Sequence, residues 1–322
     1  MGFSKDALKL DVEKEVQRIT DSLKDQVLHR MKKQGAVVGI SGGIDSSIVL
    51  ALSAKIFGPD RVLGVLLPEQ DSSKDSITLA IKLAEHYGVK YIIEDITAAL
   101  AGYNCYGRRD EAMKKIFPEF NPAYKSKIVL PTDLLERNSM NIYHLTIISP
   151  DGEEKTKRMP MKEYLQIVAA TNFKQRTRMS MLYYHAERLN YAVMGTGNKN
   201  EHDEGFFVKW GDGGADVKPI AHLYKSQVYQ LAEHLGVPKE IRERIPTTDT
   251  YTAECTQEEF FFRLPYPILD TIWYAMEHGY KVEDVAKEMD LTVEQVNRIW
   301  DEISRKIKAT EYLRMHPLEI ND

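Results

Sequence analysis

The stretch that decides the fold is residues 36–57, which read AVVGI-SGGIDSS-IVLALSAKIF. Residues 36–40 form a short apolar run rich in β-branched side chains, which predicts a buried parallel strand. The polar loop 41–45 follows, and a helix is expected to begin at about Ser46. A strand, a glycine-containing loop and a helix in this order are typical of an anion-binding turn in an α/β protein.

This loop has the composition of a phosphate site. Gly42 and Gly43 let the backbone approach an anion and turn its N–H groups toward it. The start of the following helix adds a partial positive charge at the same point. Hydroxyl donors are available from Ser41, Ser46 and Ser47. The alternative is a tight turn without a ligand, which would leave the serines and the acid of the loop without a role.

The acid in the loop, Asp45, needs a separate explanation because a carboxylate repels phosphate. Magnesium uses one or two carboxylates together with phosphate oxygens, so Asp45 is a candidate magnesium ligand. The loop contains no lysine and does not match the pattern GxxxxGK[ST]. We therefore expect it to hold a whole pyrophosphate while a substrate attacks the α-phosphorus of ATP and receives AMP.

Outward from this stretch, the pattern of strand and helix repeats. The predicted strands are residues 36–40, 61–67, 89–95 and 191–195. Besides the helix from Ser46, the predicted helices are residues 4–33, 76–88, 176–190 and 226–236. Alternating strands and helices predict an α/β fold with a doubly wound parallel sheet. We assign it to a domain spanning residues 1–264.

Residues 103–160 interrupt the alternation and are interpreted as an insertion. A short helix is expected at residues 108–117, and the turn sequence Ser149-Pro150-Asp151-Gly152 predicts a β-hairpin. The basic residues of the insertion are interpreted as a cover for the active site, a contact for a partner, or simply a solvated face. They are Arg108, Arg109, Lys114, Lys115, Lys125 and Lys127.

Residues 265–322 are expected to form a helical extension that packs on the first domain. Within it, residues 281–305 have the apolar spacing of a helix-turn-helix. A DNA-reading helix must be basic, whereas here acidic residues offset the basic ones. We therefore interpret this extension as a packing or dimer surface, with no nucleic acid as partner.

Composition limits the classes of function. The 322 residues are 43% hydrophobic and carry a formal net charge of −5, which argues against a general polyanion binder. No apolar stretch approaches the length of a membrane span, and no signal region begins the chain. Cys105 and Cys255 lie far apart, so we expect neither a disulfide framework nor a zinc site. These features predict a soluble protein of the reducing cytoplasm, without membrane contacts.

The sequence GISGGIDSS at residues 39–47 resembles the signature of the N-type ATP pyrophosphatases. That family includes NAD synthetase, GMP synthetase, asparagine synthetase and tRNA-thiolating enzymes, and the loop does not choose among them. A second group of motifs does distinguish them. GTGNKNE (195–201), GFFVKWGDGGAD (205–216) and LYKSQV (223–228), with QRTRM (175–179) upstream, closely resemble the NAD synthetase pattern. This resemblance extends from the first strand to about residue 249, apart from the insertion.

The resemblance implies roles for particular residues. ATP would be bound by Gly39, Ser41, Gly42, Gly43, Asp45, Ser46, Ser47, Thr196, Lys225 and Thr247. Asp45 and Glu201 would hold magnesium and act in catalysis together with Lys225. Deamido-NAD would be bound by Arg176, Lys209 and Asp216. Each residue alone would be read as a turn or surface residue, and it is their joint occurrence at the family's spacing that supports these roles.

The implied reaction is the amidation of deamido-NAD to NAD with ammonia, through an adenylate that releases pyrophosphate and then AMP. The family also implies a homodimer with deamido-NAD near the subunit interface. Two alternatives stay open. Another N-type ATP pyrophosphatase is one, although a tRNA-thiolating enzyme would want a reactive cysteine pair and a basic surface. The other is a regulator that holds ATP without catalysis. The presence of both Asp45 and Glu201 argues against it.

Two features concern the ends of the chain. Many relatives carry a His-Lys pair in a C-terminal run that reaches the dinucleotide, where this chain has Thr310-Glu311-Tyr312-Leu313-Arg314. The residues before Ser41 read as one helix without a cysteine, so we expect free ammonia rather than glutamine as the direct nitrogen donor. A separate glutaminase subunit that docks on residues 103–160 remains an alternative source of ammonia.

Overall fold

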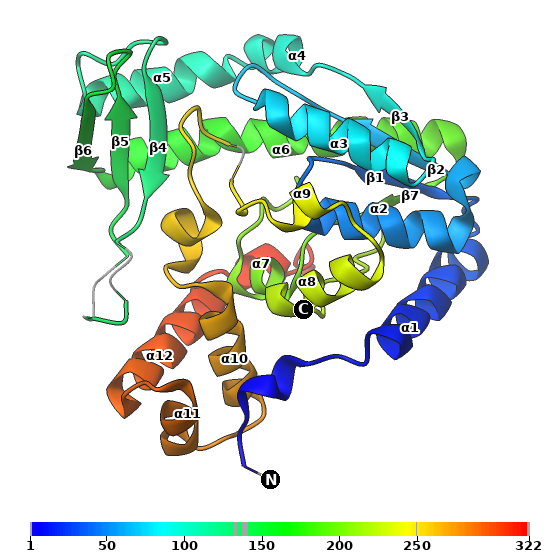
Figure 1. Ribbon diagram of the computed structural model, residues 1–322. Helices are drawn as coiled ribbons and strands as arrows, with labels where there is room; N and C mark the ends of the chain where they lie inside the picture. Colours follow the sequence, from blue (N-terminus) through cyan, green and yellow to red (C-terminus); the bar gives the residue numbers. More distant parts are fainter. Residues whose placement is uncertain (1, 132–133, 137–140, 249, 321–322) are drawn as a thin grey trace.

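The computed structural model describes residues 2–131, 134–136, 141–248 and 250–320. Its centre is a parallel sheet in the order β3-β2-β1-β7 (Figure 1). These strands are β1 (Ala36–Gly39), β2 (Val62–Leu66), β3 (Lys90–Ile93) and β7 (Ala192–Met194). All four lie within the predicted strands, so the predicted α/β fold with a parallel sheet is confirmed.

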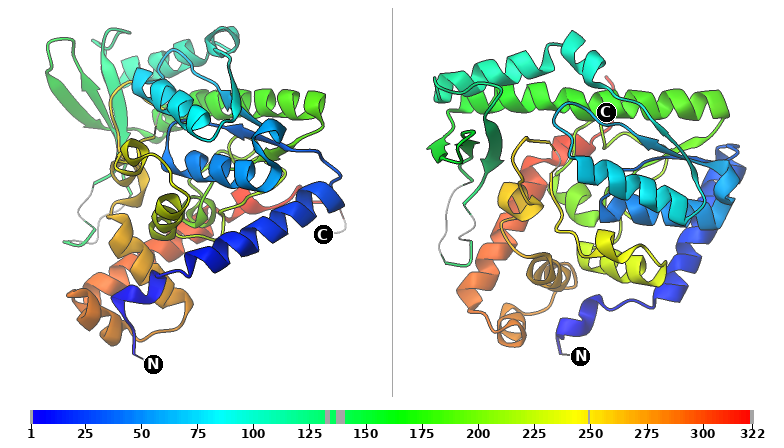
Figure 2. Two further views of the ribbon diagram at one scale, coloured as in Figure 1. Left: turned by 45° about the vertical axis from the view of Figure 1, so that its right-hand side comes forward. Right: turned by 45° about the horizontal axis from the view of Figure 1, so that its top comes forward.

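Helices cover both faces of this sheet. Successive strand residues point to opposite faces, and those of β1 are apolar on both, so both faces must be buried. Ala36 and Val38 belong to a core shared with α1, α2, α3 and α8, whereas Val37 belongs to a core shared with α4, α5 and α6 (Figure 2). The first set is α1 (Val12–Lys24), α2 (Ile44–Phe57), α3 (Lys74–His86) and α8 (Lys225–His234). Short helical turns follow α1 at Asp25–Arg30 and α2 at Pro59–Arg61, and the short helix α9 (Lys239–Arg242) follows α8. The second set is α4 (Thr97–Gly102), α5 (Cys105–Ile116) and α6 (Met161–Leu189).

Two predicted helices differ from those observed. Residues 4–33 do not form one helix, because a 3-10 turn at Lys5–Leu8 is separated from α1 by Asp11, whose side chain caps α1 at the N–H of Lys14. Helix α6 does not start at residue 176 but spans 29 residues from Met161. Its first half was missed because the face it buries includes the polar residues Thr171 and Lys174 beside Ile167 and Ala170.

The predicted insertion contains the short helix and the hairpin that the sequence suggested. Helix α5 is followed by a three-stranded antiparallel sheet, β4 (Lys125–Val129), β5 (His144–Ile148) and β6 (Glu154–Arg158), at one end of α5 and α6 (Figure 1). The β5–β6 hairpin turns at Ser149–Gly152, as predicted. Strand β4 pairs with the other edge of β5 and was not predicted.

From residue 265 the described chain is helical through Arg314, in α10 (Tyr266–Glu277), α11 (Val282–Met289), α12 (Val293–Ala309) and α13 (Glu311–Arg314). A turn at Glu258–Phe262 leads into these helices. The apolar residues of the helix-turn-helix pattern pack into a core with Trp273, and Phe3 and Leu8 join this core from the other end of the chain. Within the described residues, the structure has no helix that combines the length and apolarity of a membrane span.

Candidate active site

A cavity of about 320 Å³ opens at the carboxyl ends of β1, β2 and β7. In parallel sheets these ends meet at one edge, which is where ligands of α/β proteins bind. Its walls come from the loops after those three strands, from α6 and from the segment around Thr247. Of the ATP-binding residues predicted from sequence, Gly39, Ser41, Gly43, Asp45, Ser46, Thr196, Lys225 and Thr247 line this cavity.

The loop after β1 presents backbone N–H groups to the cavity. Gly43 precedes the first turn of α2 and provides no side-chain cap, so the first N–H groups of this 14-residue helix remain available to an anion. Ser46 and Ser47 donate their hydroxyls to the carbonyl oxygen of Gly43, at 3.0 and 2.8 Å. Gly42 and Ser47 are not among the cavity-lining residues, and they shape the loop from behind.

Gly42 tolerates no side chain, for two physical reasons. Its φ of +75° lies in the left-handed region, and an added Cβ would lie 2.5 Å from the carbonyl oxygen of Ser76. We expect Gly42→Ala to lower the free energy of unfolding by about 2 kcal/mol or more, measured by urea denaturation. Gly43→Ala is the matched control, because Gly43 has a φ of −92° and its added Cβ would meet only the Ser41 hydroxyl, at 3.3 Å. Equal losses in the two variants would contradict this account of the loop.

Two carboxylates and one lysine meet beside the loop. Asp45, in the first turn of α2, forms an ion pair with the fully buried Lys225 at the start of α8. Asp45 also accepts a hydrogen bond from the Asn198 amide at 2.9 Å. Glu201, on α7 (Lys199–Glu204), accepts one from the Gln257 amide at 3.3 Å and lines the same cavity. The structure thus brings together all three residues predicted to be catalytic.

The electrostatics of this group follow from burial. Desolvation, and then the charge of Asp45, raise the pKa of Glu201 to about 8. Burial disfavours the charged form of Lys225, but the charges of Asp45 and Glu201 outweigh it and hold the pKa of Lys225 above its ordinary value. The two carboxylates therefore repel one another, and a second cation would relieve them.

A divalent cation with few protein ligands fits this pair. Among the residues that the structure describes, no group of three or more His, Cys, Asp or Glu side chains has the arrangement of a metal site. Magnesium does not need one, because it takes one or two carboxylates and completes its shell with phosphate oxygens and water. Asp45 and Glu201, next to the phosphate loop, provide a donor set of that kind.

The three residues predicted to bind deamido-NAD do not line the cavity. Arg176 is exposed on α6 and donates to the backbone oxygen of Lys209 at 3.4 Å. The Lys209 ammonium donates to two backbone oxygens of the C-terminal segment, those of Tyr312 and Met315, at 2.9 Å each. Asp216 accepts hydrogen bonds from the Val193 N–H and the Tyr183 hydroxyl, at 2.9 and 3.1 Å. Their side chains make contacts within the protein instead.

The cavity wall contains other basic residues that sequence reasoning did not select. They are Arg178, Lys218 and Arg244. Arg178 belongs to the QRTRM motif and was within reach of that reasoning, whereas Lys218 and Arg244 had no such signal. Burial lowers the pKa of Lys218 against the opposing charge of Asp212, so its ammonium lies in a partly desolvated wall. Gln257, which contacts Glu201, also had no signal in the sequence.

The C-terminal run in which the expected His-Lys pair is missing contacts α7 through the two residues that flank the pair, Thr310 and Arg314. The Thr310 hydroxyl donates to the backbone oxygen of Glu204 at 3.1 Å, and the Arg314 guanidinium donates to that of His202 at 3.2 Å. These carbonyls belong to the last turn of α7, whose oxygens lack partners within the helix. The C-terminal segment therefore caps the helix that carries Glu201.

Comparison with known proteins shows the family of the chain. A model of the NAD synthase family matches residues 15–121 and 116–317. The NH(3)-dependent NAD(+) synthetase of Rhizobium rhizogenes is 49% identical over 317 residues, which cover 98% of this chain and 95% of that protein.

Two solved structures share the fold. An NMN synthetase from Francisella tularensis aligns with a TM-score of 0.61 at 21% identity, covering 98% of this chain and all of that one. An NH3-dependent NAD synthetase from Campylobacter jejuni, in complex with nitrate, aligns with the same TM-score and identity and covers 97% of this chain and all of that one. With the family model covering nearly the whole chain and a full-length relative at 49% identity, the chain belongs to the NAD synthase family.

Proposed function

We propose that this protein is a ligase that forms NAD from deamido-NAD and ammonia at the expense of ATP. The observation that carries the proposal is the meeting of the uncapped α2 N-terminus with Asp45, Glu201 and Lys225 at the edge of the sheet. This arrangement presents backbone donors, a buried ammonium and two carboxylates to one polyphosphate. It speaks against an ATP-binding regulator, which would not require the two carboxylates.

In the first step, the nicotinate carboxylate of deamido-NAD attacks the α-phosphorus of ATP. A bond forms between a carboxylate oxygen and phosphorus, and the bond from phosphorus to the bridging oxygen of pyrophosphate breaks. The N–H groups at the start of α2 and the Lys225 ammonium take up the charge that collects on the departing pyrophosphate. Magnesium, held by Asp45 and Glu201, would neutralise further charge on the phosphate oxygens.

In the second step, ammonia attacks the carbonyl carbon of the adenylate. The new C–N bond forms, AMP leaves with the electrons of the C–O bond, and the nitrogen releases a proton. The protein contributes mainly by positioning, because both reactions are displacements between bound partners. The basic residues of the cavity wall, Arg178, Lys218 and Arg244, are our candidates for holding the phosphates of the two nucleotides.

We propose further that the protein acts as a homodimer whose interface completes the deamido-NAD site. Arg176 lies exposed on α6, a helix that also exposes the apolar side chains of Met161, Leu165 and Tyr184. A second subunit covering this helix would bring Arg176 next to a dinucleotide bound at the cavity mouth. The free cysteines fit a reducing location, and we place the protein in the cytoplasm.

One experiment tests the activity and its mechanism together. Purified protein with deamido-NAD, ATP, magnesium and ammonium should form NAD. One AMP and one pyrophosphate should be released for each NAD formed. The reason is that a lysine-free loop holding the pyrophosphate directs attack to the α-phosphorus. Chromatography of the spent nucleotides provides the measurement, with omission of deamido-NAD as the control. ADP as the main product would exclude the adenylate mechanism, and absence of NAD would exclude the activity.

A further inference from the structure

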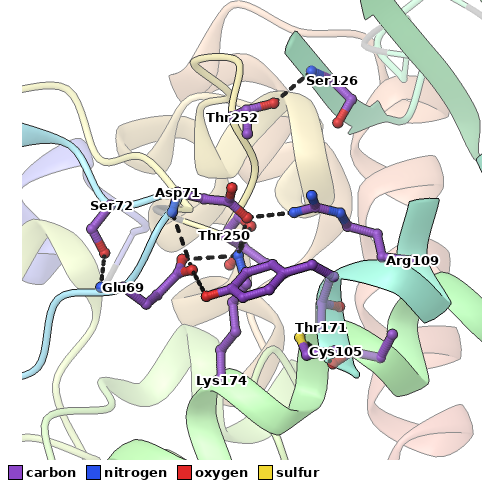
Figure 3. A network of polar contacts seen from close by, with 12 residues as sticks. Glu69, Asp71, Ser72, Cys105, Arg109, Ser126, Thr171, Lys174, Thr250 and Thr252 are labelled. Atoms are coloured by element: carbon purple, nitrogen blue, oxygen red, sulfur yellow. Dashed lines mark hydrogen bonds and ion pairs between the residues drawn. The ribbon is translucent and has the colours of Figure 1, made fainter. Parts of the chain in front are cut away.

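A second buried charge cluster joins α5 and α6 to the loop after β2 (Figure 3). Lys174 of α6 is fully buried, and its ammonium donates to three oxygens: Glu69 Oε1 at 2.9 Å, Asp71 Oδ2 at 2.7 Å and the backbone oxygen of Thr250 at 2.9 Å. Each N–H of the ammonium therefore has a partner, and these partners come from two segments far apart in sequence. Figure 3 shows Glu69, Asp71 and Arg109 converging above Lys174.

Helix α5 of the predicted insertion holds the same two carboxylates from the other side. Arg109, which is buried, forms ion pairs with Asp71 and with Asp110, and the Tyr106 hydroxyl donates to Glu69 at 2.8 Å. Desolvation alone would raise the pKa of Asp71, but the charges of Lys174 and Arg109 lower it below its usual range. Arg109 is therefore not part of a solvated face, and it joins the buried face of α5 to the loop that carries Glu69 and Asp71.

We do not expect the ion pairs of this cluster to add much to the free energy of unfolding. Taking several charges out of water costs free energy that their attraction often only just returns, and apolar residues of similar size commonly replace such clusters without loss. What a fully paired cluster provides is a unique geometry, because each carboxylate is held by more than one donor.

The segments joined by Lys174 are walls of the cavity. Leu67, Pro68 and Ser72 line it from the loop that carries Glu69 and Asp71. Thr247 and Thr248 line it from the segment that carries Thr250. On α6, the residue after Lys174 and the residue four positions later, Gln175 and Arg178, line it as well. One buried ammonium thus sets the spacing of three walls without touching the cavity itself.

We propose that Lys174 is a positioning residue for ATP, which fixes the loop after β2 and the segment of Thr250 against α6. The proposal rests on the proposed function, since it assigns the wall next to the phosphate loop to the nucleoside part of ATP. The cavity lining offers apolar side chains for a nucleoside, those of Leu66, Leu67, Met179 and Leu182. Arg178 joins the same walls, since its Nε donates to the backbone oxygen of Leu67 at 3.2 Å.

The test separates positioning from stability with two variants. Lys174→Met removes the ammonium and keeps the volume, but it leaves Glu69 and Asp71 as buried like charges. Lys174→Met combined with Glu69→Gln removes that repulsion without restoring the clamp. Ile299→Ala in the C-terminal core is the control, because it opens a cavity in a fully buried site remote from the pocket. Each variant is measured for Tm, for kcat and KM with each substrate, and for Kd of magnesium-ATP by calorimetry without deamido-NAD.

We expect Lys174→Met to lower Tm and to raise both the KM and the Kd for ATP about tenfold, because displaced walls cost binding geometry. The double variant should regain much of the Tm and keep the raised Kd. Ile299→Ala should lower Tm with the ATP Kd of the parent. A parental Kd in both Lys174 variants, or a Kd that recovers together with Tm, would overturn the positioning role. Because ATP binding is measured without turnover, failure of the parent protein to form NAD would count against the proposed function alone.

Discussion

Asp45→Asn is expected to lower kcat by about 100-fold or more, equivalent to on the order of 3 kcal/mol of transition-state stabilisation. The amide keeps the shape of the side chain but removes the negative charge that a divalent cation and Lys225 both use. With Asp45 neutral, Glu201 is the one carboxylate of the pair left to bind the cation, so the site would hold it more weakly. The measurement is the initial rate of NAD formation at saturating ATP and several magnesium concentrations.

Asp75→Asn provides the matched control, since Asp75 occupies the first turn of α3 as Asp45 occupies that of α2, and it is exposed. A general effect of removing a negative charge from a helix start would appear in both variants. We expect only Asp45→Asn to lose activity. Turnover within a few-fold of the parent would remove Asp45 from the magnesium site.

Glutamine should support a rate about 100-fold below that of ammonium, because neither Cys105 nor Cys255 is suited to hydrolyse it. Glutaminases use a cysteine thiolate, which forms where the pKa of the thiol is lowered. Here both cysteines are buried; burial raises the pKa of Cys105 and raises that of Cys255 to about 12. The measurement compares initial rates with ammonium and with ammonia-free glutamine at equal nitrogen concentration.

The control variant for this comparison is Cys105→Ser combined with Cys255→Ser. Any rate seen with glutamine should be the same in the parent and in this variant, because it would come from residual ammonia. A parent that prefers glutamine and loses that preference in the variant would reveal an amidase site. If addition of a second, separately purified protein allowed the use of glutamine, that result would instead support a separate glutaminase subunit as the source of ammonia.

The fold and the phosphate loop were predictable because their signals are local. A β-branched run, two glycines and a helix start lie within residues 36–57, so neighbouring residues alone impose the turn and its φ values. The same holds for the hairpin at Ser149–Gly152. Where burial depends on distant partners, prediction failed. The first half of α6 buries Thr171 and Lys174, and a polar residue on a buried face breaks the apolar periodicity on which helix prediction relies.

The sequence by itself therefore determined the parallel sheet and the candidate phosphate loop, and its resemblance to the NAD synthetase pattern pointed to Asp45, Glu201 and Lys225 as candidate catalytic residues. The tertiary structure alone decided which side chains complete the walls around them. It placed Gln257 on Glu201, set Lys218 and Arg244 in the cavity, and turned Lys209 toward the C-terminal segment. The physical reason is that these contacts join residues dozens to more than a hundred positions apart, and pairing over such distances is a property of packing that leaves no periodicity or spacing in the chain.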